Sequence, residues 1–176
     1  IPGGNSIVSP ADGRIISIID TSDEEIKIKK GLFGKIRTLA KDIADECYVV
    51  SIFMSPFDAH INRAPIDGIV KSVKHEKGHF YKAYDLEKSF ENEKNEIVIE
   101  DKKNKIKVKV IQIAGFLARR IRCYVKQGEK VNKGGKVGMI ALGSQATLIM
   151  PKNKVKLAVK KGDKVKAGSS IIGYLS

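Results

Sequence analysis

The sequence has no tryptophan, only two cysteines and no long apolar run. Cys47 and Cys123 are far apart and share no metal-ligand spacing, which excludes a disulfide scaffold and favours a reducing compartment. A helix that crosses a bilayer needs roughly 18–20 consecutive apolar residues, and no stretch approaches that length. The sequence begins at Ile1 without a methionine, so we expect a targeting or anchoring segment upstream.

Acidic residues are also scarce. There are 20 Asp and Glu against 33 Lys and Arg, which gives a formal net charge of +13. A chain of 176 residues suits one domain with its own core, and 42% hydrophobic residues exclude a disordered tail. The charge predicts an anionic partner, either nucleic acid, lipid headgroups or a small acidic ligand. Nucleic acid is the weakest choice, because only five Tyr and six Phe are available to stack on bases.

Most of the sequence is typical of short β-strands. Clusters of β-branched residues alternate with turn signals. Residues 105–110 alternate charged and apolar side chains, as in a half-buried antiparallel strand, and Asp101–Asn104 before them predicts a hairpin turn. The predicted strands are 6–8, 14–19, 25–29, 48–53, 68–74, 96–100 and 106–114.

One segment, 31–46, has a helical period instead, with an apolar stripe from Leu32 to Ile43. Two interpretations are open. The helix packs on its own sheet, or it lies in a membrane surface with Leu32 and Phe33 inserted beside basic residues. A second stretch, 80–92, is polar and predicts a short helix or an ordered loop.

The last third of the sequence contains an internal repeat. The pattern V-x-x-G-x-x-V-x-x-G at 125–134 recurs 34 positions later at 159–168. It resembles the half-repeats of biotinyl and lipoyl carrier domains. The predicted fold class is therefore mainly β (α+β): an antiparallel β-barrel or sandwich with a C-terminal pseudo-repeat and one or two short helices.

Three patches carry residues suited to chemistry. The first is Ser9-Pro-Ala-Asp-Gly13, which by itself reads as a turn into a strand. The second, Phe53–Pro65, places a His, an Asp, an Arg and an Asn directly after a strand, where functional loops tend to lie. The third is Gly138–Gln145, which ends an apolar strand with Leu142-Gly143-Ser144.

Together these patches resemble the phosphatidylserine decarboxylase family, most closely its short bacterial and archaeal branch, which includes archaetidylserine decarboxylases. The resemblance covers nearly the whole chain as one catalytic domain. Its motifs, in order, are Ser9–Gly13, Met54–Pro65, Gly78-x-Phe80-x-x-Ala83 leading to Glu91–Glu93, Ile113–Ile121, and Gly138–Ile140 before Leu142–Ser144.

The resemblance implies a lyase that processes itself. The proenzyme would cut the Gly143–Ser144 bond into a β chain, 1–143, and an α chain, 144–176. The Ser144 hydroxyl would attack the preceding carbonyl, and elimination and hydrolysis would leave a pyruvoyl group at the new N-terminus, the only cofactor implied. Serine suits this step because its oxygen is both nucleophile and leaving group. The substrate would be phosphatidylserine or archaetidylserine, decarboxylated to the ethanolamine lipid at the cytoplasmic face of the cell membrane.

The resemblance also implies roles for single residues. Asp12 matches an Asp that helps to activate the Ser, and His60 matches a His linked to decarboxylation. A second family His, which acts in self-cleavage, is replaced here by Arg63, and a guanidinium cannot act as a base at neutral pH. Either His60 serves both steps, which we predict, or cleavage uses a different base, such as Asp12. Arg63 would then hold a carboxylate or phosphate of the headgroup or form a salt bridge to Asp58 or Asp67.

Further substrate contacts are expected from His79, Phe80 and Arg119, which match or border the same motifs. No metal site is expected. Partners would be the lipid, an anionic membrane surface, the two cleaved chains and a second copy of the protein.

Two other classes remain as alternatives. A biotinyl or lipoyl carrier would explain the repeat, but it needs an exposed Lys at a hairpin tip, and Lys152 is a poor match. A sugar-transport phosphocarrier would use His60 or His75 to accept phosphate, and it leaves Leu142-Gly143-Ser144 unexplained.

Overall fold

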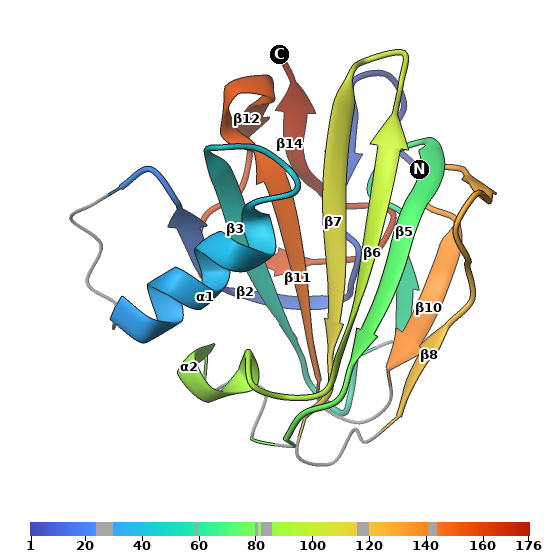
Figure 1. Ribbon diagram of the computed structural model, residues 1–176. Helices are drawn as coiled ribbons and strands as arrows, with labels where there is room; N and C mark the ends of the chain where they lie inside the picture. The colour runs from blue at the N-terminus through green and yellow to red at the C-terminus, as the bar shows by residue number, and fades with distance from the viewer. Residues whose placement is uncertain (24–29, 59, 80, 82–85, 116–119, 141–143) are drawn as a thin grey trace.

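Three antiparallel sheets build the protein, and one helix lies across the largest of them (Figure 1). The computed structural model describes the chain except for residues 24–29, 59, 80, 82–85, 116–119 and 141–143, and it describes residues 87 and 144 by their backbone only. The mainly β prediction is confirmed. Among the described residues, no helix is long and apolar enough to span a membrane.

The largest sheet has eight strands in the order β13-β2-β3-β11-β7-β6-β5-β9. Their bounds are β13 Lys164–Val165, β2 Gly13–Asp20, β3 Cys47–Met54, β11 Ser144–Pro151, β7 Ile106–Ile113, β6 Lys94–Asp101, β5 Gly68–Glu76 and β9 Lys130–Val131. Two small sheets have the orders β1-β14-β12 and β4-β10-β8. Their bounds are β1 Ser6–Val8, β14 Ile171–Leu175, β12 Val155–Leu157, β4 Ile61–Arg63, β10 Lys136–Ile140 and β8 Ile121–Cys123. The helices are α1 Lys30–Ala40, α2 Leu86–Ser89 and the 3-10 turn η1 Lys152–Lys154.

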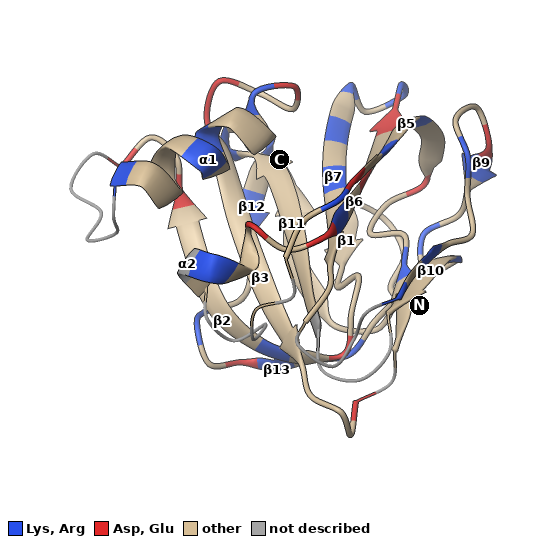
Figure 2. Ribbon diagram, turned by 60° about the horizontal axis from the view of Figure 1, so that its bottom comes forward, with Lys and Arg blue, Asp and Glu red and all other residues tan. Residues whose placement is uncertain are grey.

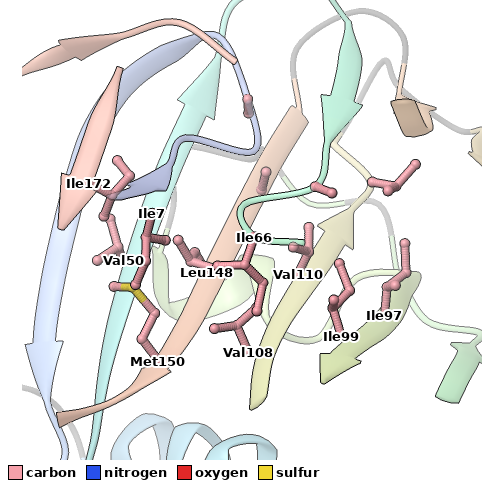
Figure 3. Close-up of a cluster of buried hydrophobic side chains, with 14 of the residues drawn as sticks. Ile7, Val50, Ile66, Ile97, Ile99, Val108, Val110, Leu148, Met150 and Ile172 are labelled. Atoms are coloured by element: carbon pink, nitrogen blue, oxygen red, sulfur yellow. The ribbon is translucent and has the colours of Figure 1, made fainter. Parts of the chain in front are cut away.

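Both faces of the central strands are buried, because successive side chains of a strand point to opposite faces. Leu148 of β11 and Val50 of β3 belong to the core inside the curled sheet, together with Ile7 and Ile172 from the small sheet (Figure 3). Their strand neighbours, such as Ile149, face the other way and pack against α1. The middle of the eight-stranded sheet is therefore dry on both sides.

The helix α1 buries Leu32, Ile36 and Leu39 against the outer face of this sheet. The interpretation that this segment packs on its own sheet is confirmed. Leu32 is 9% exposed and Ile36 fully buried, so the apolar stripe is not available to enter a membrane. The helix also ends earlier than the predicted 46, at Ala40.

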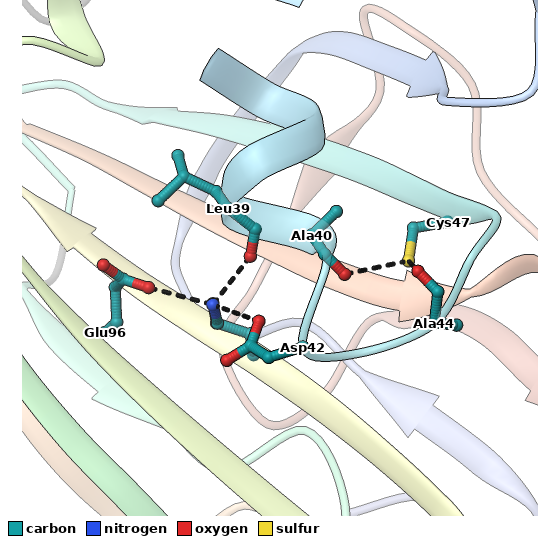
Figure 4. Close-up of polar contacts among 7 residues, drawn as sticks. Leu39, Ala40, Asp42, Ala44, Cys47 and Glu96 are labelled. Atoms are coloured by element: carbon teal, nitrogen blue, oxygen red, sulfur yellow. Dashed lines mark hydrogen bonds and ion pairs between the residues drawn. The ribbon is translucent and has the colours of Figure 1, made fainter. Parts of the chain in front are cut away.

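A buried lysine joins the end of α1 to the sheet (Figure 4). The Nζ atom of Lys109 on β7 donates to the Leu39 carbonyl at 2.6 Å, to Asp42 Oδ1 at 2.7 Å and to Glu96 Oε1 at 2.9 Å. A cation at the last carbonyls of a helix also interacts favourably with the helix dipole. Nearby, burial raises the pKa of the Cys47 thiol to about 11, so this cysteine stays protonated and unreactive.

The sheet order reads the same way from both ends. Each half runs from a short outer strand through two long strands to a central strand, β13-β2-β3-β11 in one half and β9-β5-β6-β7 in the other. The small sheets correspond in the same way, β1-β14-β12 to β4-β10-β8. The protein is therefore two copies of one seven-stranded unit.

Copy two is continuous, β4 to β10, whereas copy one consists of β1–β3 and β11–β14. Copy two is thus inserted into copy one between β3 and β11. In copy two the equivalent strands, β6 and β7, are joined directly by a short hairpin after Asp101. The two insertion junctions are residues 55–60 and 141–143.

Individual bonds repeat between the copies. In copy one the Gly162 amide donates to the Ile15 carbonyl at 2.8 Å, and in copy two the Gly128 amide donates to the Val70 carbonyl at 2.8 Å. The repeated glycines at 128, 134, 162 and 168 all have positive φ, between 74° and 96°, which favours glycine. The C-terminal repeat predicted from the sequence is therefore real, and it is one part of a larger duplication.

Candidate functional site

The segments singled out in the sequence meet at one end of the large sheet. Strand register shows this directly, because Ser144 pairs with Met54, Gln145 with Ile113, and Ile113 with Lys94. The end of β3, the start of β11, the end of β7 and the start of β6 therefore lie along one edge, the lower one in Figure 1. Gly13, the last residue of the first motif, begins β2 at the same edge. We call this the catalytic edge.

Ser144 begins β11, in the middle of the sheet, with β3 on one side and β7 on the other. Gly143 lies outside the described residues. The next side chain, Gln145, is fully buried. Its Nε2 donates to Ser89 Oγ of α2 at 2.8 Å, and its Oε1 accepts from Thr147 Oγ1 at 2.9 Å. Thr147 Oγ1 in turn lies 3.1 Å from Ser51 Oγ on β3. The strand that follows position 144 is therefore fixed by side-chain hydrogen bonds.

His60 lies at the other junction, just before β4. Its carbonyl accepts from the Ile140 amide at 3.1 Å, so the backbones of the two junctions are hydrogen-bonded directly ahead of residues 141–143. The imidazole is half-buried. Its Nδ1 atom is buried and, among the described residues, has no hydrogen-bond partner. Buried polar atoms normally have partners, so this ring nitrogen is an exception among the described residues.

Asp12 has a structural role. Its Oδ1 accepts from the Ala167 amide at 2.7 Å, and at the equivalent place in copy two Asp67 Oδ1 accepts from the Lys133 amide at 2.7 Å. Within the described part of the chain, no hydrogen bond joins Asp12 to His60. Asp12 does line a hollow of about 310 Å³ at the catalytic edge, with Asp58, Lys164 and Lys166, so the carboxylate is open on one side.

Arg63 is bound to the repeat. Its Nη1 donates to the Gly134 carbonyl at 2.7 Å, and its side chain packs on the turn at Gly168. The carboxylates predicted as salt-bridge partners are engaged elsewhere, since Asp58 accepts from the Ser55 amide and Asp67 from the Lys133 amide. The guanidinium retains further N–H donors.

The other predicted substrate contacts are placed less completely. His79 is exposed, and its backbone forms an isolated parallel β-bridge with Asn92. The centroid of its ring lies 5.2 Å from that of Tyr81. Phe80 and Arg119 lie outside the described residues. The short helix predicted within 80–92 is present as α2, Leu86–Ser89.

A buried polar chain beneath the edge was not predicted. Gln112 Nε2 donates to Asn62 Oδ1 at 3.1 Å, and Asn95 Nδ2 donates to Gln112 Oε1 at 2.9 Å. All three side chains are almost fully buried. An amide in an otherwise apolar strand, as at Gln112 in Val110–Ile113, was the signal available in the sequence.

Known proteins resemble this chain over almost its full length. The sequence profile described as phosphatidylserine decarboxylase matches residues 1–173. The chain belongs to the phosphatidylserine decarboxylase family. It is therefore a decarboxylase, a carboxy-lyase.

Three relatives within this family illustrate the likeness. A Methanocaldococcus jannaschii protein named as an archaetidylserine decarboxylase proenzyme is 43% identical over 172 residues, 97% of this chain and 81% of the relative. Phosphatidylserine decarboxylase proenzymes of Geotalea uraniireducens and Chlorobium limicola are 39% and 38% identical, covering 97% and 95% of this chain and 71% and 69% of their own length. The resemblance inferred from the motifs is thus confirmed.

Proposed function

We propose that this decarboxylase cuts itself between Gly143 and Ser144 and then decarboxylates the serine headgroup of phosphatidylserine or archaetidylserine. The observation that carries the proposal is the convergence of the family motifs on one sheet edge, with position 144 at its centre. The names of the relatives support both parts, because they describe lipid decarboxylases made as proenzymes.

Self-cleavage needs a nucleophile, a base and a strained or mobile bond. The Ser144 hydroxyl would attack the carbonyl of Gly143, so that the peptide becomes an ester and the nitrogen of residue 144 becomes an amine. A base would then remove the Cα proton of residue 144 while the carboxylate of Gly143 leaves from Cβ, which gives dehydroalanine. Hydrolysis of its imine tautomer, with release of ammonia, would leave a pyruvoyl group at residue 144. Glycine before the serine removes the Cβ that would crowd the attack.

His60 is the base that we propose for the cut. The bond from the Ile140 amide to the His60 carbonyl ties this residue to the junction that leads to Ser144. The unpaired Nδ1 of its imidazole is available to accept a proton. Imidazole accepts a proton near neutral pH, which Arg63 cannot do. Asp12 would act from a distance, by fixing the turn that borders the site and by adding negative charge to it.

The residues present fit a pyruvoyl group at position 144. The buried Gln145 and its partners fix the start of β11, so a group at residue 144 would have a defined place at the edge. A pyruvoyl group supplies a ketone that serves as an electron sink when the carboxylate of an amino acid leaves as carbon dioxide. The same His60 would hold the proton that returns to the substrate carbon.

The headgroup contacts remain proposals. His79 and the free donors of Arg63 are suited to the carboxylate and the phosphate of a serine phospholipid, and Phe80 and Arg119 are proposed with them from the family motifs. The net charge of +13 supports an anionic membrane surface as partner, and we place the protein at the cytoplasmic face of the cell membrane.

The carrier-domain alternative is disfavoured by Lys152. Its Nζ lies 2.7 Å from Asp20 Oδ2 and donates to Ser22 Oγ at 2.8 Å. An attachment lysine must project freely, whereas this side chain, at the start of η1, is held in an ion pair.

Intact mass and a denaturing gel test the proposal. The purified protein is expected to give two fragments, the smaller beginning at a blocked residue 144, and Ser144→Ala is expected to stay uncut. His60→Ala is expected to slow the cut strongly, whereas His75→Ala, an exposed histidine on β5, serves as the matched control and is expected to cut normally. An active protein that remains a single chain with an ordinary Ser144 would refute the pyruvoyl mechanism, and normal cutting by His60→Ala would refute the role of His60.

A further inference from the structure

The loop at the first insertion junction carries the most exposed aromatic side chain among the described residues. Phe57 is 98% exposed, whereas the next aromatic residues in exposure, Tyr124 and Tyr174, are 46% and 40% exposed. Phe57 lies between β3 and β4, at the catalytic edge and directly after the strand end that pairs with Ser144.

The loop holds Phe57 outward in a preformed turn. The Asp58 amide donates to the Ser55 carbonyl at 3.0 Å, and the Ser55 amide donates to Asp58 Oδ2 at 2.8 Å. The Phe57 amide donates to Ser55 Oγ at 3.3 Å, and Pro56 suits the second position of such a turn. The side chain is therefore presented by a closed turn, whose preformed backbone lowers the cost of ordering the loop on binding.

Lysines lie beside the base of this turn. Asp58 shares a hollow with Lys164 and Lys166 of the β13 segment, and that segment, 160–166, has four lysines and one aspartate. Figure 2 shows Lys and Arg (blue) at β13, interspersed with acidic residues (red). The hollow also contains the carboxylates of Asp12 and Asp58, which accept from the Ala167 and Ser55 amides, so the excess of positive charge comes from the rest of segment 160–166.

From these observations we infer that Phe57 is a membrane anchor of the catalytic domain, inserted into an anionic bilayer while the lysines of 160–166 contact the lipid phosphates. An aromatic tip with lysines beside its base matches the chemistry of a bilayer interface, apolar below and anionic above. The inference rests on the proposed function, because a lipid substrate requires the catalytic edge to face the membrane. The apolar stripe of α1 cannot replace Phe57 in this role, because it is packed on the sheet.

A single introduced tryptophan tests the anchor, since the natural chain has none. The Phe57→Trp variant is mixed with vesicles of phosphatidylcholine containing about a third phosphatidylglycerol. Its emission is expected to shift to the blue and to be quenched by brominated acyl chains. The matched control is Tyr174→Trp on β14, away from the catalytic edge, and it is expected to show neither change.

Vesicle sedimentation measures how much Phe57 contributes to the affinity for the membrane. Phe57→Ser is expected to bind these vesicles roughly tenfold more weakly than the natural protein, a difference of about 1.4 kcal/mol, and high salt is expected to release both. Equal binding by Phe57→Ser, or no blue shift of Phe57→Trp on vesicles that capture the protein, would overturn the inference. Loss of a dimer in Phe57→Ser, seen by sedimentation velocity without any change in vesicle binding, would also overturn it and assign Phe57 to contact between copies.

Failure of the anchor is distinguishable from failure of the proposed function. Self-cleavage is intramolecular, so Phe57→Ser is expected to cut itself as completely as the natural protein. If the natural protein binds vesicles through Phe57 but never cuts, the proposed mechanism fails while the anchor stands.

Discussion

At the scale of single residues, Asp12 shows how one side chain serves the fold and is also proposed to serve the chemistry. It and Asp67 each follow a proline by two positions, precede a glycine, and accept from a backbone amide of the repeat at 2.7 Å. A Cβ on the following glycine would collide with a neighbouring strand carbonyl in both copies. The Pro-x-Asp-Gly pattern is therefore a structural device of the fold, used twice.

This pairing gives an internal control for catalysis. Asp12→Asn and Asp67→Asn each weaken one hydrogen bond, so both are expected to lower the free energy of unfolding by a similar amount, about 1 kcal/mol, in urea titrations. Only Asp12→Asn is expected to slow self-cleavage at residue 144, because only Asp12 lies at the catalytic edge. An equal effect of both variants on the rate of cutting would assign Asp12 to the fold alone.

The sequence predicted Asp12, His60 and Ser144 as one group only through the family motifs. The amides at Asn62, Gln112 and Asn95 could not be predicted, because a buried hydrogen bond depends on partners from distant strands. The second Pro-x-Asp-Gly, at residues 65–68, was visible in the sequence and would have indicated the duplication.

At the scale of elements, long periodic segments were predicted well, and most three-residue strands were not. The predicted strand 6–8 agrees with β1, and 106–114 agrees with β7 to within one residue. The helical stripe within 31–46 gave α1. The three-residue strands β4, β8 and β12 were missed, because three residues are too few to show a period. Their pairing is determined by the sheet around them. The predicted strand 25–29 lies outside the described residues.

The lysine that joins α1 to the sheet predicts a large loss of stability. Lys109→Met would leave Glu96, which is 7% exposed, without its cation. Breaking a buried ion pair costs about 3–5 kcal/mol, and urea unfolding measures it. Lys107→Met on the same strand, where the lysine is less buried, is the matched control and is expected to change stability by less than about 0.5 kcal/mol.

A double variant separates the lost pair from lost packing. Replacing both partners, Lys109→Met with Glu96→Leu, removes the unpaired charge, and it is expected to recover much of the loss. Equal stability of Lys109→Met and Lys107→Met would show that the ion pair contributes nothing to the attachment of α1.

At the scale of the whole molecule, residues 144–176 pair mainly with the rest of the chain, and one ladder, between β12 and β14, lies within this segment. The central strand β11 pairs with β3 and β7, β13 pairs with β2, and β14 pairs with β1. Together with burial of both faces of β11, these ladders should hold a cut fragment without a covalent link.

We therefore expect the two fragments to elute as one species from a size-exclusion column under native conditions and to separate only in denaturant. The uncut Ser144→Ala chain is the control and should elute at the same volume. A small fragment that leaves on dilution would contradict this expectation, and it would mean that β11 is held less firmly than its bonds indicate.

The insertion of one copy into the other also defines where the chain can be reconnected. Asn5 and Leu175 are bonded in both directions, the Leu175 amide to the Asn5 carbonyl at 2.8 Å and Asn5 Nδ2 to the Leu175 carbonyl at 3.0 Å. A short linker can therefore join the two ends of this sequence. A circular permutant opened before residue 144 would make copy one continuous and follow it with copy two, as an ordinary tandem. Such a permutant would be synthesised with its N-terminus at the catalytic edge. A chain end at residue 144 would then no longer depend on self-cleavage.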